Sequence, residues 1–190
     1  MFAHEHFRKF TYKEMVLVVA LALISSLIIF LSVEKLDPSI AIIVSLASGA
    51  FFMNLAVYLI NKSGSALIFY FLLGLFTILL DDLGLYGWQK ILVYILVGIV
   101  FEIIFLVLKL PIHNLPLDMI LGTSVSTSLI ILFSSMLILF GFPTDFPLQL
   151  INLILVAFFT GLFSSSLVFV LWHLVANTKF VIKFKNYLGY

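Results

Sequence analysis

Long hydrophobic runs alternate with short polar segments along the chain, and this pattern predicts six membrane-spanning helices. A helix needs about 20 apolar residues to cross about 30 Å of hydrocarbon. The runs are continuous and lack the apolar–polar alternation of barrel strands, so helices are favoured over a barrel. We predict spans at residues 15–33, 40–60, 66–80, 91–108, 117–140 and 148–176, of which the third is short.

Composition agrees with an all-α integral membrane protein. The 190 residues are 64% hydrophobic and 10% charged, whereas soluble domains are about 25% charged. The first apolar run follows a polar segment without a small-residue cleavage site, which is typical of a retained span rather than a signal peptide. We therefore expect a six-helix domain at 15–177 between cytoplasmic or interfacial segments at 1–14 and 178–190.

The distribution of basic residues predicts that both termini are cytoplasmic. Basic side chains concentrate in cytoplasmic segments of membrane proteins. Lys35 and Lys90 fall on the opposite side of the predicted spans from all the others, and the loops at 34–39, 81–90 and 141–147 are then external. The basic residues on the cytoplasmic side are Arg8, Lys9, Lys13, Lys62, Lys109, Lys179, Lys183 and Lys185.

Several classes of function find no support in the residues. The chain has no cysteine and a net charge of only +1, so neither thiolate chemistry nor a nucleic-acid partner is expected. Nucleophile elbows, zinc-binding helices and phosphate-binding loops are also missing from the sequence. We expect a protein in contact with membrane lipid that is not an enzyme and that has no metal or cofactor.

Polar and aromatic residues near the external ends of the last three spans form a candidate ligand site. Aromatic stacking combined with a few convergent hydrogen bonds is typical of small-molecule pockets. The alternative is an interfacial aromatic belt, with Asp81 and Asp82 as solvated loop charges. The candidate ligand-binding residues are Tyr86, Trp88, Gln89, Ser135, Gln149 and Asn152.

Glu102 is a carboxylate within the fourth predicted span. Charged side chains at such depth are costly and normally face the protein interior or a cavity. We expect a structural or gating role, in which the carboxyl is either protonated or bonded to a hydroxyl of the fifth span such as Ser124, Ser126 or Thr127. Asn54 and Thr77 are likewise expected to bond across helices.

Small residues in the first span, Ala22 and Ser26, are four positions apart. Such pairs allow helices to pack closely in lipid. The helix that packs against them could belong to this chain or to another subunit.

Two short segments resemble the substrate-binding S components of energy-coupling-factor vitamin transporters, particularly the branch for hydroxymethylpyrimidine or thiamine precursors. The segments are 62–67 (KSGSAL) and 98–105 (GIVFEIIF). Ser63 stands where that branch has proline, and Tyr70 where it tends to have an acidic residue.

The resemblance implies a subunit without an ATPase of its own that captures a vitamin-like molecule near the external face. It also implies a transmembrane coupling subunit, contacted through Ala22 and Ser26, and cytoplasmic ATPases. The alternative is a non-catalytic helical subunit that assembles into a larger membrane complex and binds no ligand.

Overall fold

The structure is a computed structural model that describes residues 9–60, 62–108, 111–112, 115–139, 147–179 and 181–183. It is all-helical apart from one ladder of two-residue strands, in which β1 (Pro111–Ile112) pairs antiparallel with β2 (Leu115–Pro116). The helices are α1 (Tyr12–Lys35), α2 (Pro38–Ile60), α3 (Ser65–Phe76), α4 (Trp88–Leu108), α5 (Leu117–Leu139) and α6 (Pro147–Val175).

Five of these helices are long and apolar enough to cross a membrane, as in a multi-pass membrane protein. Their bounds agree with the predicted spans to within a few residues. The exception is α3, which has 12 residues and is therefore about 18 Å long at 1.5 Å per residue. This length is well short of the roughly 30 Å of hydrocarbon in a bilayer, so the prediction of six full spans is not confirmed.

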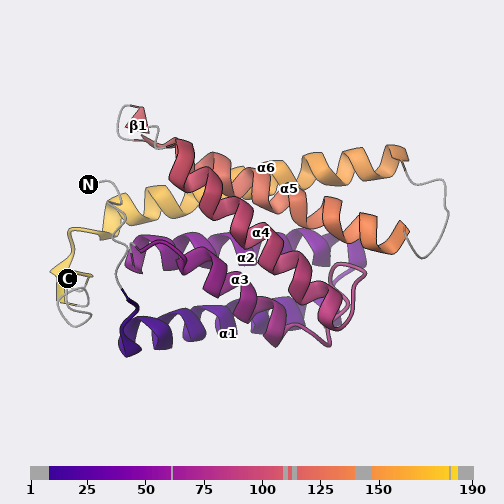
Figure 1. Ribbon diagram of the computed structural model, residues 1–190, viewed down its shortest axis with the longest axis horizontal. Coiled ribbons are helices and arrows are strands. Elements are labelled where there is room, and N and C mark those ends of the chain that lie inside the picture. Colours follow the sequence, from indigo (N-terminus) through magenta and orange to yellow (C-terminus); the bar gives the residue numbers. More distant parts are fainter. Residues whose placement is uncertain are drawn as a thin grey trace.

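The helices form a closed ring in the order α1, α2, α6, α5, α4 and α3, and α3 packs back against α1. Helix α2 also contacts α3 and α5 across the ring. In Figure 1 the start of α1 and the end of α6 lie at one end of the bundle, which we call the terminal end. The connections α1–α2 and α3–α4 lie at the opposite end, which we call the distal end.

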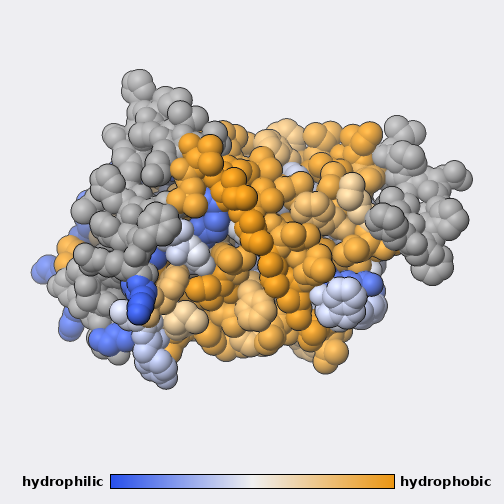
Figure 2. Space-filling model, in the orientation of Figure 1, coloured by the Kyte–Doolittle hydropathy of each residue, from blue (hydrophilic) through white to orange (hydrophobic). Residues whose placement is uncertain are grey.

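The middle of the bundle presents a hydrophobic surface, and hydrophilic residues gather toward its ends (Figure 2). Apolar side chains such as Leu27, Phe163 and Leu174 point outward from their helices and are exposed. An apolar exterior of this kind is stable only in contact with hydrocarbon, because exposed apolar patches of this extent are rare on soluble proteins.

Local sequence explains where α1 and α3 begin. Thr11 and Glu14 form a capping box at the start of α1, in which the Thr11 N–H donates to Glu14 Oε2 at 2.6 Å. Gly64 precedes α3 with a φ of 88°, a conformation that glycine adopts without steric cost. Between them, Lys62 Nζ lies 2.7 Å from Glu14 Oε2, so the starts of these two helices are joined by a buried ion pair.

Polar side chains also join helices across the interior. Thr123 Oγ1 of α5 donates to Asn54 Oδ1 of α2 at 2.9 Å, which confirms that Asn54 bonds across helices. The Thr77 hydroxyl does not bond across helices, because it donates to the Leu73 carbonyl of the preceding turn, although the Thr77 carbonyl accepts from Lys90 of α4. A threonine hydroxyl is satisfied by a carbonyl four residues earlier without a partner helix.

Candidate ligand-binding site

The residues predicted to bind a ligand lie at the distal end (Figure 1), but those with described side chains do not converge on one cavity. Trp88 and Tyr86 are 68% and 60% exposed, and Gln89 and Asn152 are also exposed. Ser135 is buried and donates to the Ile131 carbonyl of its own helix. The Gln149 side chain lies outside the described part of the chain. A stacking pocket built from these residues therefore stays a prediction.

Glu102 has a structural partner that was not expected. Its Oε1 accepts a hydrogen bond from the Ala66 N–H at 3.0 Å, in the first turn of α3. The first N–H groups of a helix have no partner within that helix, and the helix dipole favours negative charge there. Hydroxyls of α5 were expected instead, but Ser124 and Thr127 donate to carbonyls of α5 and α6.

The two segments that carry the family resemblance meet at this point. Glu102 belongs to the segment 98–105 and Ala66 to the segment 62–67. Gly98 adds a second contact, since a Cβ at this position would lie 3.0 Å from Leu67 Cα. The glycine therefore allows α4 to approach α3 closely enough for the Glu102 carboxylate to reach the start of α3.

Lys90 occupies the other end of α3. This lysine is 0% exposed, and its Nζ donates to the Thr77 and Leu80 carbonyls, each at 2.9 Å, and to Asp82 Oδ1. A lysine ammonium has three donors, so all three are used. Thr77 is the C-cap of α3 and Leu80 lies in the turn beyond it, so Lys90 holds the turn that ends α3, near the negative pole of the helix dipole.

Asp82 is not the solvated loop charge that the sequence suggested, although its neighbour Asp81 is exposed. Asp82 is 2% exposed and forms a buried ion pair with Lys90. Its second oxygen, Oδ2, is buried and has no hydrogen-bond partner among the described residues. Burial raises the pKa of Asp82 above its ordinary value, while the charge of Lys90 acts in the opposite direction.

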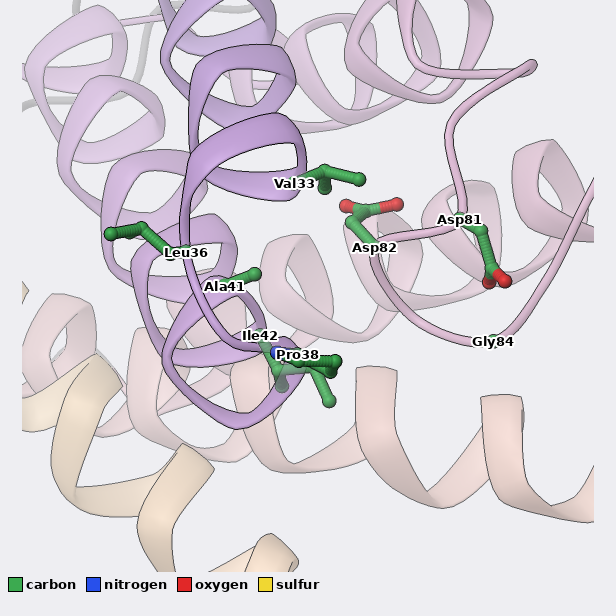
Figure 3. Close-up of a pocket in the computed structure, with 8 residues that line it drawn as sticks. All are labelled: Val33, Leu36, Pro38, Ala41, Ile42, Asp81, Asp82 and Gly84. Atoms are coloured by element: carbon green, nitrogen blue, oxygen red, sulfur yellow. The ribbon is translucent and has the colours of Figure 1, made fainter.

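A cavity of about 280 Å³ adjoins this carboxylate, between the α1–α2 connection and the loop from α3 to α4. Figure 3 shows that the Asp82 carboxylate is directed toward Val33 near the end of α1. The cavity thus has an apolar wall on one side and two carboxylates on the other. Its lining residues are Val33, Leu36, Pro38, Ala41, Ile42, Asp81, Asp82 and Gly84.

The sequence interpretation missed both Lys90 and the apolar side of this cavity. The sequence interpretation treats Lys90 only as an external basic residue, although it directly precedes the fourth predicted span and lies in the first turn of α4. A lysine at the start of an apolar helix needs a nearby partner, and two aspartates precede it by eight and nine residues. That spacing could have predicted the ion pair between Asp82 and Lys90. No local pattern marks Ala41 or Ile42, because α2 is apolar on all sides.

Ala22 and Ser26, predicted to contact a coupling subunit, are buried within the chain at 0% and 8% exposure. Helix α1 packs on α2 and α3. A partner helix could not reach Ala22 in this structure unless α1 moved away from its neighbours.

Comparison with known proteins adds no information about this site. No protein-family model, curated protein or solved structure matches the chain.

Proposed function

We propose that this protein is the substrate-capture subunit of an uptake transporter of the energy-coupling-factor type in the cell membrane. It holds a vitamin-like small molecule at the distal end of the bundle, and a thiamine precursor such as hydroxymethylpyrimidine is the candidate ligand. A transmembrane coupling subunit and cytoplasmic ATPases would supply the transport step.

The observation that carries the proposal is the cavity at the distal end, with an apolar wall and a buried carboxylate. Pockets for drug-sized ligands usually measure about 300–1,000 Å³ and combine apolar walls with few polar groups. A cavity of about 280 Å³ suits a smaller molecule. A helical assembly subunit would need no such cavity, so this feature favours ligand capture over the assembly role.

Mass spectrometry of small molecules retained through purification tests the proposal most directly. We expect a vitamin-like compound at near-stoichiometric amounts, and we expect hydroxymethylpyrimidine or thiamine to compete with it. Protein that carries no small molecule and binds neither compound would overturn the capture function.

The proposed orientation places the distal end outside the cell. Among the described residues, Lys9, Lys13, Lys62, Lys179 and Lys183 lie at the terminal end, whereas only Lys35 and Lys90 lie at the distal end, and Lys90 is paired with Asp82. Because the chain has no cysteine, single cysteines can report the topology. We expect an impermeant thiol reagent to label Ser39→Cys but not Asn177→Cys in intact cells. Labelling of Asn177→Cys alone would invert the orientation.

Trp88 remains a proposed ligand contact. It is exposed next to the buried Lys90, so Trp88→Ala should leave the folded bundle intact. We expect this substitution to weaken binding of the retained compound, as measured by isothermal titration. Unchanged affinity would remove Trp88 from the site without affecting the cavity.

Coupling through α1 can be tested with two alanines of the same helix. Ala22 is buried and Ala20 is exposed. If the proposed contact at Ala22 and Ser26 forms when α1 moves, Ala22→Trp should abolish co-purification with the coupling subunit, whereas Ala20→Trp should not. Recovery of the partner with folded Ala22→Trp protein would refute this contact.

A further inference from the structure

Several buried polar atoms have no hydrogen-bond partner among the described residues, and Asp82 Oδ2 is the one of them that belongs to a residue lining the cavity. Oδ1 is bound to Lys90, but Oδ2 is buried without a partner among the described residues. A buried polar atom without a hydrogen bond costs about 1–3 kcal/mol. The Asp82 side chain is 0% exposed, so a donor from the adjoining cavity would remove this cost when the side chains that line the cavity shift to admit it.

The charges around the cavity indicate what kind of donor is favoured. Lys90 balances one of the two lining carboxylates, and Asp81 leaves one negative charge uncompensated. Around the adjoining end of α1, the exposed residues Glu34, Lys35 and Asp37 include two acids and one base, so this segment adds no positive charge overall. A cation is therefore attracted to the cavity, and an anion is repelled.

We propose that the cavity binds a small, flat organic cation, with an N–H group of the cation donating to Asp82 Oδ2 and its apolar body packed against Val33, Ala41 and Ile42. The inference rests on the proposed capture function and adds the charge and the position of the ligand, so among thiamine-type compounds it favours a cationic one such as thiamine over neutral hydroxymethylpyrimidine. It places the ligand against the α1–α2 connection, and a contact with Trp88 at the start of α4 is a separate proposal with its own test.

A metal ion fits the same surroundings less well. Among the described residues, no group of three or more side chains of the types that ligate metals comes together. Calcium takes six to eight oxygen ligands and magnesium six. The cavity supplies two carboxylates, one of them already bound to Lys90, together with an apolar wall. An organic cation uses the wall and needs only one free carboxylate oxygen.

Three probes of nearly the same shape but different charge test the proposal: benzamidine, benzamide and benzoate. Benzamidine is a flat cation with N–H donors, benzamide is its neutral counterpart, and benzoate is the anion. We expect benzamidine at millimolar concentration to bind the full-length protein in detergent and to displace the retained compound. Benzamide should bind at least about tenfold more weakly, since hydrogen bonds to charged groups are the stronger ones. Benzoate should not bind.

Two variants connect binding to this cavity. Ala41→Leu fills the cavity without changing any charge and should abolish benzamidine binding. The double variant Asp82→Asn, Lys90→Gln removes both charges of the buried pair together, which avoids leaving an isolated buried ammonium. It should weaken benzamidine binding about tenfold or more. Ala20→Leu, on the exposed side of α1, is the matched control and should bind normally.

The outcomes separate this inference from the function on which it rests. Equal binding of the three probes, or full benzamidine binding by folded Ala41→Leu protein, overturns the inference. A retained compound that is an anion, or one whose binding neither variant changes, also overturns the inference. In each of these outcomes the proposed capture function is still supported. Protein that retains no compound and binds none of the probes overturns both.

Discussion

The two ends of α3 are held by the same helix in different ways. At its start, Glu102 of α4 accepts a hydrogen bond from the Ala66 N–H. At its end, Lys90 of α4 donates to two carbonyls and to Asp82. Lys90 and Glu102 are 12 residues apart along α4, and α3 itself has 12 residues. Because α3 and α4 are antiparallel, each charge lies at the pole of the α3 dipole that it stabilises.

The difference between the two ends lies in what surrounds the carboxylate. Glu102 lies where α3 and α4 pack closely through Gly98, and it does not line the distal cavity, although its Oε2 is also buried without a partner among the described residues. Asp82 lies in a loop beside a cavity. A short helix that cannot span the bilayer leaves space beyond its end, and this space is where we place the ligand. The comparison suggests that Glu102 serves the fold and that Asp82 serves both fold and binding.

The largest effect is expected at the distal end. Lys90→Met removes the partner of buried Asp82 and the donor to the Thr77 and Leu80 carbonyls. Breaking one side of a buried ion pair costs about 3–5 kcal/mol, and we expect a loss of stability of this size in denaturant titrations in detergent.

The matching double variant sharpens this test. In Lys90→Met, Asp82→Asn no buried charge remains, so much of the lost stability should return. If the double variant is as unstable as Lys90→Met alone, the Asp82–Lys90 pair is not the source of the effect, and the proposed charge balance at the cavity is wrong.

A smaller effect is expected at the start of α3. Glu102→Leu leaves the Ala66 N–H unsatisfied and should cost about 1–3 kcal/mol. Glu102→Gln keeps an acceptor and loses only the interaction of its charge with the helix dipole, worth about 1 kcal/mol. Neither variant should change benzamidine affinity. The measurement is the free energy of unfolding, with the exposed change Ile103→Val as control. Loss of binding in folded Glu102→Gln protein would contradict a purely structural role.

The smallest effect is a pH dependence of binding that only the distal end should show. Burial raises the pKa of Asp82, and the ionised form is the one that attracts a cation. Benzamidine affinity should therefore fall as the pH falls, starting at a higher pH than for an exposed aspartate. Lys90, Asp81 and Tyr94 are the neighbouring titratable groups. Isothermal titration over a pH series should show this decline in Asp81→Asn but not in the Asp82→Asn, Lys90→Gln double variant.

The sequence predicted much of the fold and little of the cavity. The helix bounds could be predicted from the apolar runs, because each run must by itself be long enough to cross the hydrocarbon. Glu102 was correctly singled out, because a carboxylate in an apolar span needs an explanation wherever it lies. Its partner was assigned to α5 instead of α3, because hydroxyl side chains are visible in a sequence whereas an unsatisfied backbone N–H is not.

By itself, the sequence determined that the chain is an apolar, helical protein suited to a membrane, because hydrophobicity and helix length are properties of each segment. Only the tertiary structure decided that Asp82 is buried and paired with Lys90 while Asp81 is exposed, although the two aspartates are adjacent and identical in type. Which of them is buried depends on where α3 ends and on how closely α4 and the α1–α2 connection approach. Those distances are set by packing between segments far apart in the chain.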